Sequence, residues 1–246
     1  ELPFPDGSRQ TTIDFRYFCF SDYNPSVFFE DRIIMDIWNA VLQGKKVLIL
    51  GDTPATTVFG CFAALSLLSP LRFRGNYALW IRKGDPRFDE IIGGTSNFVL
   101  VGSSDRSLSQ FFDFTFRANV ILDQSIESNA VLLARDQTKK ILKLLLYEMN
   151  EMLVLDPYSD IVGKPINREH VVSLLKELKK RHLPAIEDIM AFTKTPSFMV
   201  WRRNYQIREN LRNSLLSADI DFVFRDKTKE DLLKIQKAIE TFEIIF

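Results

Sequence analysis

One short run constrains the fold of this chain more than any other: Val47 to Leu50, four consecutive aliphatic residues. Successive side chains of a strand point to opposite faces, so a strand of this kind is buried on both sides. It therefore lies in a sheet that helices cover on both faces. The sequence Gly51-Asp52-Thr53-Pro54 that follows predicts a turn, a helix cap and a proline at the first helical position.

The rest of the first half alternates between short strands and helices. Ile33, Ile37, Trp38 and Val41 share one face of a helix that we expect to end at Gly44. Further strands are predicted at residues 12–17, 76–81, 98–101 and 119–122, with helical segments at 86–92 and 108–114. This alternation predicts an α/β fold, with a three-layer, mainly parallel sheet flanked by helices.

The character of the sequence changes near residue 128, after which helical periodicity dominates. Two helices are predicted around residues 141–152 and 171–178, separated by a turn-rich linker at 156–165. A last strand is conceivable at 222–224, and Thr228 with Asp231 predicts the capped start of a final helix with an inner face of Leu232, Ile235, Ile239 and Phe242. We therefore expect an α/β central domain over 1–127 and a helical subdomain over 128–246.

Charge and composition exclude several classes of protein. The 32 Lys and Arg residues balance 32 Asp and Glu residues, so no global field favours nucleic acid. The longest apolar stretch, at 58–71, is shorter than the roughly 20 residues that cross a membrane. Cys19 and Cys61 are expected as buried thiols of a reducing compartment, which we favour over a Cys19–Cys61 disulfide. The start at Glu1 without an initiator Met or a leader predicts a fragment of a longer protein.

Searches for catalytic and cofactor motifs select no residue. The turn at Gly51 lacks the second glycine and the lysine of a phosphate loop, although its helix N-terminus could hold an anion. Gly93-Gly94 is interpreted as a turn with positive φ, not as a dinucleotide site. His170 and His182 are the only histidines, and His170 is expected to be solvated or capping. We expect no metal, no cofactor and no catalytic residue.

Two basic groups of residues have competing interpretations. The segment 201–212 mixes cations with aromatics, and we favour a solvated helix side opposite Tyr205, Ile207 and Leu211 over a nucleic-acid site. A charged rim is favoured over an arginine that acts in trans on GTP hydrolysis. The arginines concerned are Arg72, Arg74, Arg82 and Arg87.

An ordered set of short motifs resembles the DENN domain family. The central DENN region is matched by Trp38 through Gly44, the strand at 47–50, Leu68-Ser69-Pro70-Leu71 and Gly93-Gly94-Thr95-Ser96-Asn97. The downstream helical region is matched by Lys164-Pro165-Ile166-Asn167-Arg168 and by Lys194-Thr195-Pro196-Ser197-Phe198 leading to Trp201. The likeness spans about residues 30 to 215 and is greatest to the subgroup called DENN domain-containing protein six and its fungal or protist relatives.

The resemblance implies a regulator of Rab small GTPases that accelerates GDP release in vesicle trafficking. Members of the family act without a covalent step and without a cofactor. A longin-like lobe, which is not visible before the first helix, or a second subunit would complete the module. The resemblance also implies a cytoplasmic protein that reaches endosomal or vesicle membranes only through its partners.

Loops at strand ends are the predicted contacts with a partner, because a rigid sheet presents such loops to solvent. The candidates are Asp52, Thr53, Thr95, Ser96, Asn97, Ser103, Ser104 and Asp105. Structural roles are expected for Trp38, Trp80 and Trp201. Two alternatives stay open: a non-enzymatic scaffold of a trafficking or nutrient-sensing complex, and a metabolite-binding α/β protein.

Overall fold

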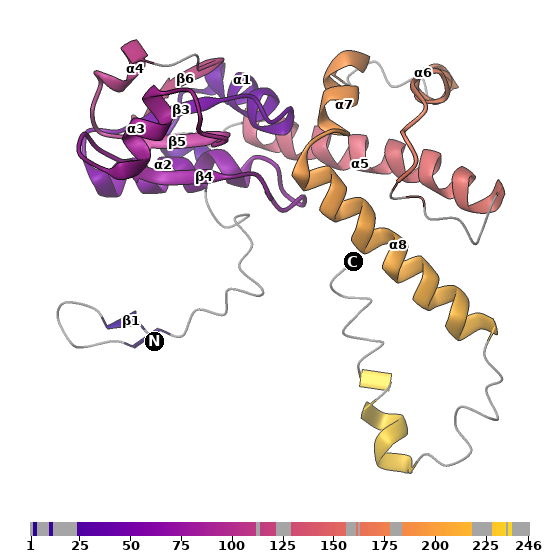
Figure 1. The fold of residues 1–246 in the computed structure, drawn as a ribbon. Helices are drawn as coiled ribbons and strands as arrows, with labels where there is room; N and C mark the ends of the chain where they lie inside the picture. The colour runs from indigo at the N-terminus through magenta and orange to yellow at the C-terminus, as the bar shows by residue number, and fades with distance from the viewer. Residues whose placement is uncertain are drawn as a thin grey trace. The chain divides into compact units, whose positions relative to one another are not determined.

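The computed structural model describes residues 2–3, 10–11, 24–111, 114–121, 129–155, 161, 163–177, 184–217, 228–234 and 236–237 (Figure 1). The chain divides into two compact units, Glu1–Arg202 and Arg203–Phe246. Several predictions fall outside the described residues: the strands at 12–17 and 222–224, most of the linker at 156–165, and Cys19 and His182.

The first unit contains a parallel sheet of four strands, β3 Val47–Leu50, β4 Tyr77–Ile81, β5 Leu100–Ser103 and β6 Phe116–Asn119. Their order across the sheet is β4-β5-β3-β6, so β3 and β5 are central. Every residue of β3 is buried, as its four aliphatic side chains predict. A separate antiparallel pair joins β1 Leu2–Pro3 to β2 Gln10–Thr11.

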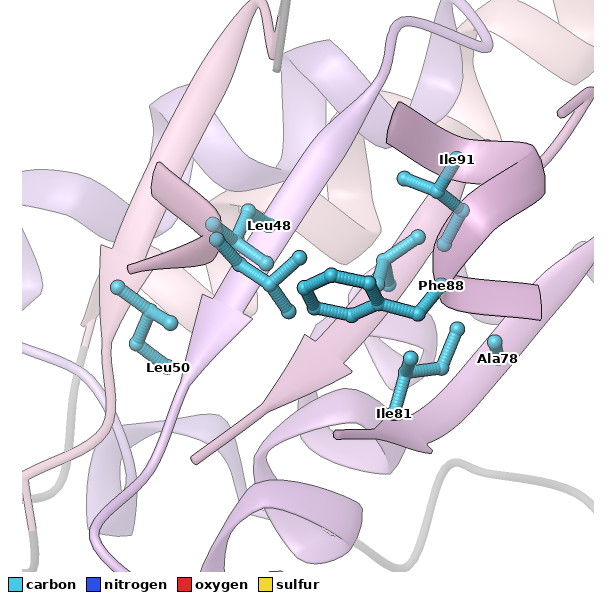
Figure 2. Close-up of a cluster of buried hydrophobic side chains, with 8 residues drawn as sticks. Leu48, Leu50, Ala78, Ile81, Phe88 and Ile91 are labelled. Carbon is cyan, nitrogen blue, oxygen red and sulfur yellow. The ribbon is translucent and has the colours of Figure 1, made fainter. Parts of the chain in front are cut away.

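Helices cover both faces of the sheet, which confirms the predicted three layers. After the 3-10 helix η2 Pro25–Val27, helices α1 Asp31–Leu42 and α2 Pro54–Ser66 pack on one face. Helices α3 Pro86–Ile92 and α4 Leu108–Phe111 lie on the other. Figure 2 shows the Phe88 ring of α3 reaching over the sheet toward Leu48. The predicted helix at 86–92 has its predicted bounds.

Helix α2 approaches the sheet closely because glycines stand at the contact. A Cβ atom at Gly60 would lie 2.5 Å from Cγ2 of Val120 and 3.2 Å from Cγ2 of Ile49. On β5, a Cβ atom at Gly102 would overlap the carbonyl oxygen of Leu79 and lie 2.7 Å from Sγ of Cys61 on α2. Cys61 is a free, buried thiol, and burial raises its pKa.

Most of the helix ends lie where the sequence predicts them. Thr53 caps α2 in a capping box with Thr56, and Gly44 closes α1 at φ +68°. Of the glycine pair before β5, only Gly94 has positive φ. The predicted strand at 119–122 is wrong by three residues, because β6 pairs with β3 from Phe116 and ends at Asn119.

Beyond residue 128, the described residues form helices and their connections. Helix α5 Asn129–Leu155 packs against α1, and α6 Arg168–Glu177 packs against α5 and α7 Ile186–Phe192. Helix α8 Pro196–Ser217 follows. The last described strand of the sheet, β6, ends at Asn119. The domain boundary at residue 128 stays a prediction, since α5 to α7 belong to the first compact unit.

The second unit, from Arg203, contains most of α8 and the helical residues 229–234. Thr228 and Asp231 form the predicted reciprocal cap, in which each backbone N–H donates to the other side chain. The expectation for α8 needs correction: Tyr205 is buried, but Ile207 is 56% exposed and Leu211 is 51% exposed. These two residues therefore do not lie on the packed side of the helix.

Within the described ranges, no helix combines the length and the apolar character that crossing a bilayer requires.

Leu232, which we expected on an inner face, is 40% exposed.

We predict that Gly102→Ala lowers the free energy of unfolding by about 1–3 kcal/mol, because the added methyl group meets backbone atoms that cannot move aside easily. Urea denaturation of the variant and the parent measures the difference. Gly163→Ala is the matched control, since a Cβ atom there meets nothing within 4 Å. Equal stability of Gly102→Ala and the parent would contradict the close packing of β4 and α2 around Gly102.

Candidate functional site

The carboxyl ends of the parallel strands meet at one edge of the sheet. Leu50 pairs in register with Ser103 on one side and with Asn119 on the other. The loops that follow the strands therefore leave the same edge. We call this the carboxyl edge and define it as residues 51–53, 82–85 and 104–106. Among the predicted contacts, Asp52, Thr53, Ser104 and Asp105 belong to it, and Ser103 lies directly beneath it.

The chain path diverges between β3 and β5 at this edge. The loop after β3 leads to α2 on one face, whereas the loop after β5 leads to α4 on the opposite face. In open α/β sheets such a point is the usual place for ligands and partners. Asp52 and Arg106 bridge the two loops at 3.4 Å, and their side chains are 82% and 78% exposed. Because exposed pairs contribute little to stability, both groups are available to a partner.

Ser103 and Asp105 hold the loop after β5 in shape. Ser103 is fully buried, and its hydroxyl donates to the carbonyl of Ile81 at 2.7 Å and accepts from the Asp105 N–H at 3.0 Å. The Asp105 carboxylate accepts the Ser107 N–H at 2.9 Å. Hydrogen bonding from Ser107 lowers the pKa of Asp105. Ser103 is thus a supporting residue, and it does not present its side chain at the surface.

Aromatic and cationic groups border the loop. Trp80 is half-buried, and its indole N–H donates to the Ser104 hydroxyl at 3.2 Å. The guanidinium of Arg82 lies 5.6 Å from the centre of the Trp80 ring. Arg87 pairs with Asp85 at 2.6 Å, which lowers the pKa of Asp85. Trp80 therefore supports the carboxyl edge, whereas the 2% exposed Trp38 has the structural role expected of it.

Four amides in and just after the turn that follows β3 donate within the chain. The N–H of Gly51 donates to the carbonyl of Ser103, and the N–H groups of Thr56 and Thr57 donate to the hydroxyl and the carbonyl of Thr53. The N–H of Thr53 donates to the Thr56 hydroxyl at 3.0 Å. A phosphate loop needs such donors to face a ligand, so this arrangement disfavours the metabolite-binding interpretation.

Three predicted contact residues lie at the opposite edge. Thr95, Ser96 and Asn97 precede β5, whose four residues, about 13 Å of strand, lie between them and Ser104. Thr95 and Ser96 both donate backbone N–H groups to the carbonyl of Glu90, so they close the end of α3. Thr95, Ser96 and Asn97 come before a strand, whereas the residues of the carboxyl edge come after one. This difference in the sequence indicates that the two groups lie at opposite edges of the sheet.

Polar contacts join the sheet layers to the helices that follow. The indole N–H of Trp38 donates to the Thr138 hydroxyl at 2.8 Å, which fixes α1 on α5. Gln43 donates to Asp188 of α7 at 2.8 Å. Nearby, a Cβ atom at Gly44 would lie 3.2 Å from Cγ2 of Thr195. We call this set of contacts the helix junction.

A second pair of contacts extends the helix junction. The backbone N–H of Arg74 donates to the Ser197 hydroxyl at 2.9 Å, and Arg135 Nε donates to the carbonyl of Ser66 at 3.3 Å. Many of the residues on which the family resemblance rests thus lie at or beside internal contacts. These positions are Trp38, Gln43, Gly44, Thr195 and Ser197.

A buried carboxylate fastens α6 to α5. Glu148 is 1% exposed; it contacts Nδ1 of His170 and accepts the Asn167 N–H at 3.1 Å. Nε2 of His170 lies 2.6 Å from the exposed carboxylate of Glu151. His170 is therefore a bridging residue that tethers α6, and the expectation of a solvated or capping histidine missed both partners. No sequence spacing connects positions 22 residues apart in this way.

No protein-family model and no curated protein matches this chain.

We predict that the Trp38–Thr138 hydrogen bond couples α1 to α5 by about 1 kcal/mol. Trp38→Phe and Thr138→Val, made singly and together, form a double-mutant cycle, and urea denaturation gives the free energy of unfolding of each variant. A coupling free energy near zero would contradict a stabilising role for this hydrogen bond in the helix junction.

Proposed function

We propose that this protein is a DENN-type regulator of Rab small GTPases, which binds the GTPase and promotes exchange of GDP for GTP in vesicle trafficking. The observation that carries the proposal is the carboxyl edge. Asp52, Ser104 and Arg106 stand there on a rigid parallel sheet, with their neighbouring backbone fixed by hydrogen bonds. Loops on such a scaffold suit the recognition of a protein partner.

Two further observations support the same proposal. The motifs that resemble the family contribute to the helix junction, so they help to hold the sheet and the helical segments together. The N–H groups of Gly51, Thr53, Thr56 and Thr57 donate within the chain, which favours a protein partner over a phosphate compound. We propose a cytoplasmic protein with recruitment to endosomal or vesicle membranes, completed by a longin-like lobe or a second subunit.

Nucleotide exchange of this kind needs binding energy and no covalent step. An exchange factor binds the nucleotide-free GTPase better than the nucleotide-loaded one. It must therefore weaken the affinity of the GTPase for its nucleotide by the same factor. Each tenfold of this coupling requires about 1.4 kcal/mol of differential contact. Exposed charged groups such as Asp52 and Arg106 would contribute to that difference only if they contact the GTPase directly.

We predict that the full chain accelerates release of fluorescent GDP from at least one member of a panel of Rab proteins. Asp52→Arg and Arg106→Asp should each slow the accelerated release about fivefold or more, since each charge faces the partner. Asn97→Ala, at the opposite edge, is the control and should leave the rate unchanged.

The charge-swapped double variant separates a partner contact from a structural ion pair. If Asp52 and Arg106 serve only each other, the swap restores the rate; the proposal expects it to remain slow. Tight binding of a Rab protein with unchanged GDP release would support the scaffold alternative. No binding and no release across the panel would contradict the proposed function.

A further inference from the structure

The solvent side of α5 carries a combination of residues that the proposed function does not use. Leu132 is 67% exposed, and Leu133 and Tyr147 are each 44% exposed. Lys139 and Lys143 are exposed between them. At 100° per residue, these five side chains fall within about one third of the helix circumference, so they form one continuous face. We call it the leucine–lysine face.

The opposite side of α5 is packed into the first unit. Ala134, Ile141 and Leu145 are each fully buried. The leucine–lysine face is therefore the outer side of a helix whose position is fixed by packing. From Leu132 to Tyr147 it extends over about 22 Å. Apolar groups stand at both ends of this length, with cations in the middle.

Carboxylates on the same side do not cancel the cations. Asp136 pairs with Lys140 at 2.6 Å, so these two charges neutralise each other. Glu151, at the far end, lies 2.6 Å from Nε2 of His170 and is engaged there. Lys139 and Lys143 remain as the net charge beside the leucines. A surface complementary to the leucine–lysine face is one that carries both apolar groups and negative charge.

We infer that the leucine–lysine face binds an anionic lipid surface. Lysine is depleted at protein interfaces, where arginine is preferred, whereas long lysine side chains can place their ammonium groups among lipid headgroups. Leucines beside such lysines bury themselves at the boundary between headgroups and acyl chains, and tyrosine suits the same depth. This inference differs from the sequence-based expectation that membranes are reached only through partners, and it does not depend on the proposed function.

The test is co-sedimentation of the full chain with vesicles of phosphatidylcholine alone and of phosphatidylcholine mixed with phosphatidylserine in equal parts. We expect binding to the anionic vesicles only, weakened by added salt. Lys139→Gln combined with Lys143→Gln should weaken the partition about twenty-fivefold, at about fivefold for each lysine. Leu132→Ser combined with Leu133→Ser should weaken it about tenfold or more.

Lys45→Gln combined with Lys194→Gln is the matched control, because it removes two exposed lysines elsewhere in the first unit. Circular dichroism melts verify that each variant folds, and the lysine pair decides the question if the serine pair does not fold. Equal binding to both vesicle types, or equal loss in the control and the Lys139/Lys143 variant, would overturn the inference. Capture by an acidic protein without vesicle binding would also overturn it. No GTPase is present, so the result is independent of exchange activity.

Discussion

The burial of β3 on both faces is the constraint on which the rest of this structure depends. Four aliphatic side chains in a row cannot face water on either side, so α2 must cover one face and α3 with α4 the other. The close fit of α2 on the sheet, through its own Gly60 and through Gly102 of β5, follows from that requirement. Once the helices after β3 and β5 lie on opposite faces, their loops diverge at one edge, where Ser103 and Trp80 hold the loop after β5 by hydrogen bonds.

The helix junction extends this order beyond the sheet. Because Trp38 and Gln43 project from the same helix to α5 and α7, the position of α1 on the sheet also sets the position of the helices that follow. The buried carboxylate of Glu148 then fastens α6 through His170 and Asn167. An unpaired buried carboxylate would be costly, so these contacts specify one arrangement of α6 more than they add net stability.

The sequence predicts the layers well because local patterns determine them. Periodicity and caps located α1, α2 and α3, and the aliphatic run located β3. The predicted strand at 119–122 is three residues too late, because the segment from Phe116 to Leu122 is compatible with several strand registers. Only pairing with β3 selects one of them. The contacts Trp38–Thr138 and Glu148–His170 join positions that no pattern links. The predicted contact residues lie at both edges of the sheet, because the prediction of loops at strand ends does not distinguish the loop before a strand from the loop after it.

The proposed docking face for a small GTPase is the carboxyl edge. Hydrogen–deuterium exchange of the full chain, alone and with a saturating nucleotide-free Rab protein, tests it most directly. We expect slower exchange at residues 51–53 and 104–106, with residues 95–97 unchanged. Slower exchange at 95–97 with no change at the carboxyl edge would contradict it.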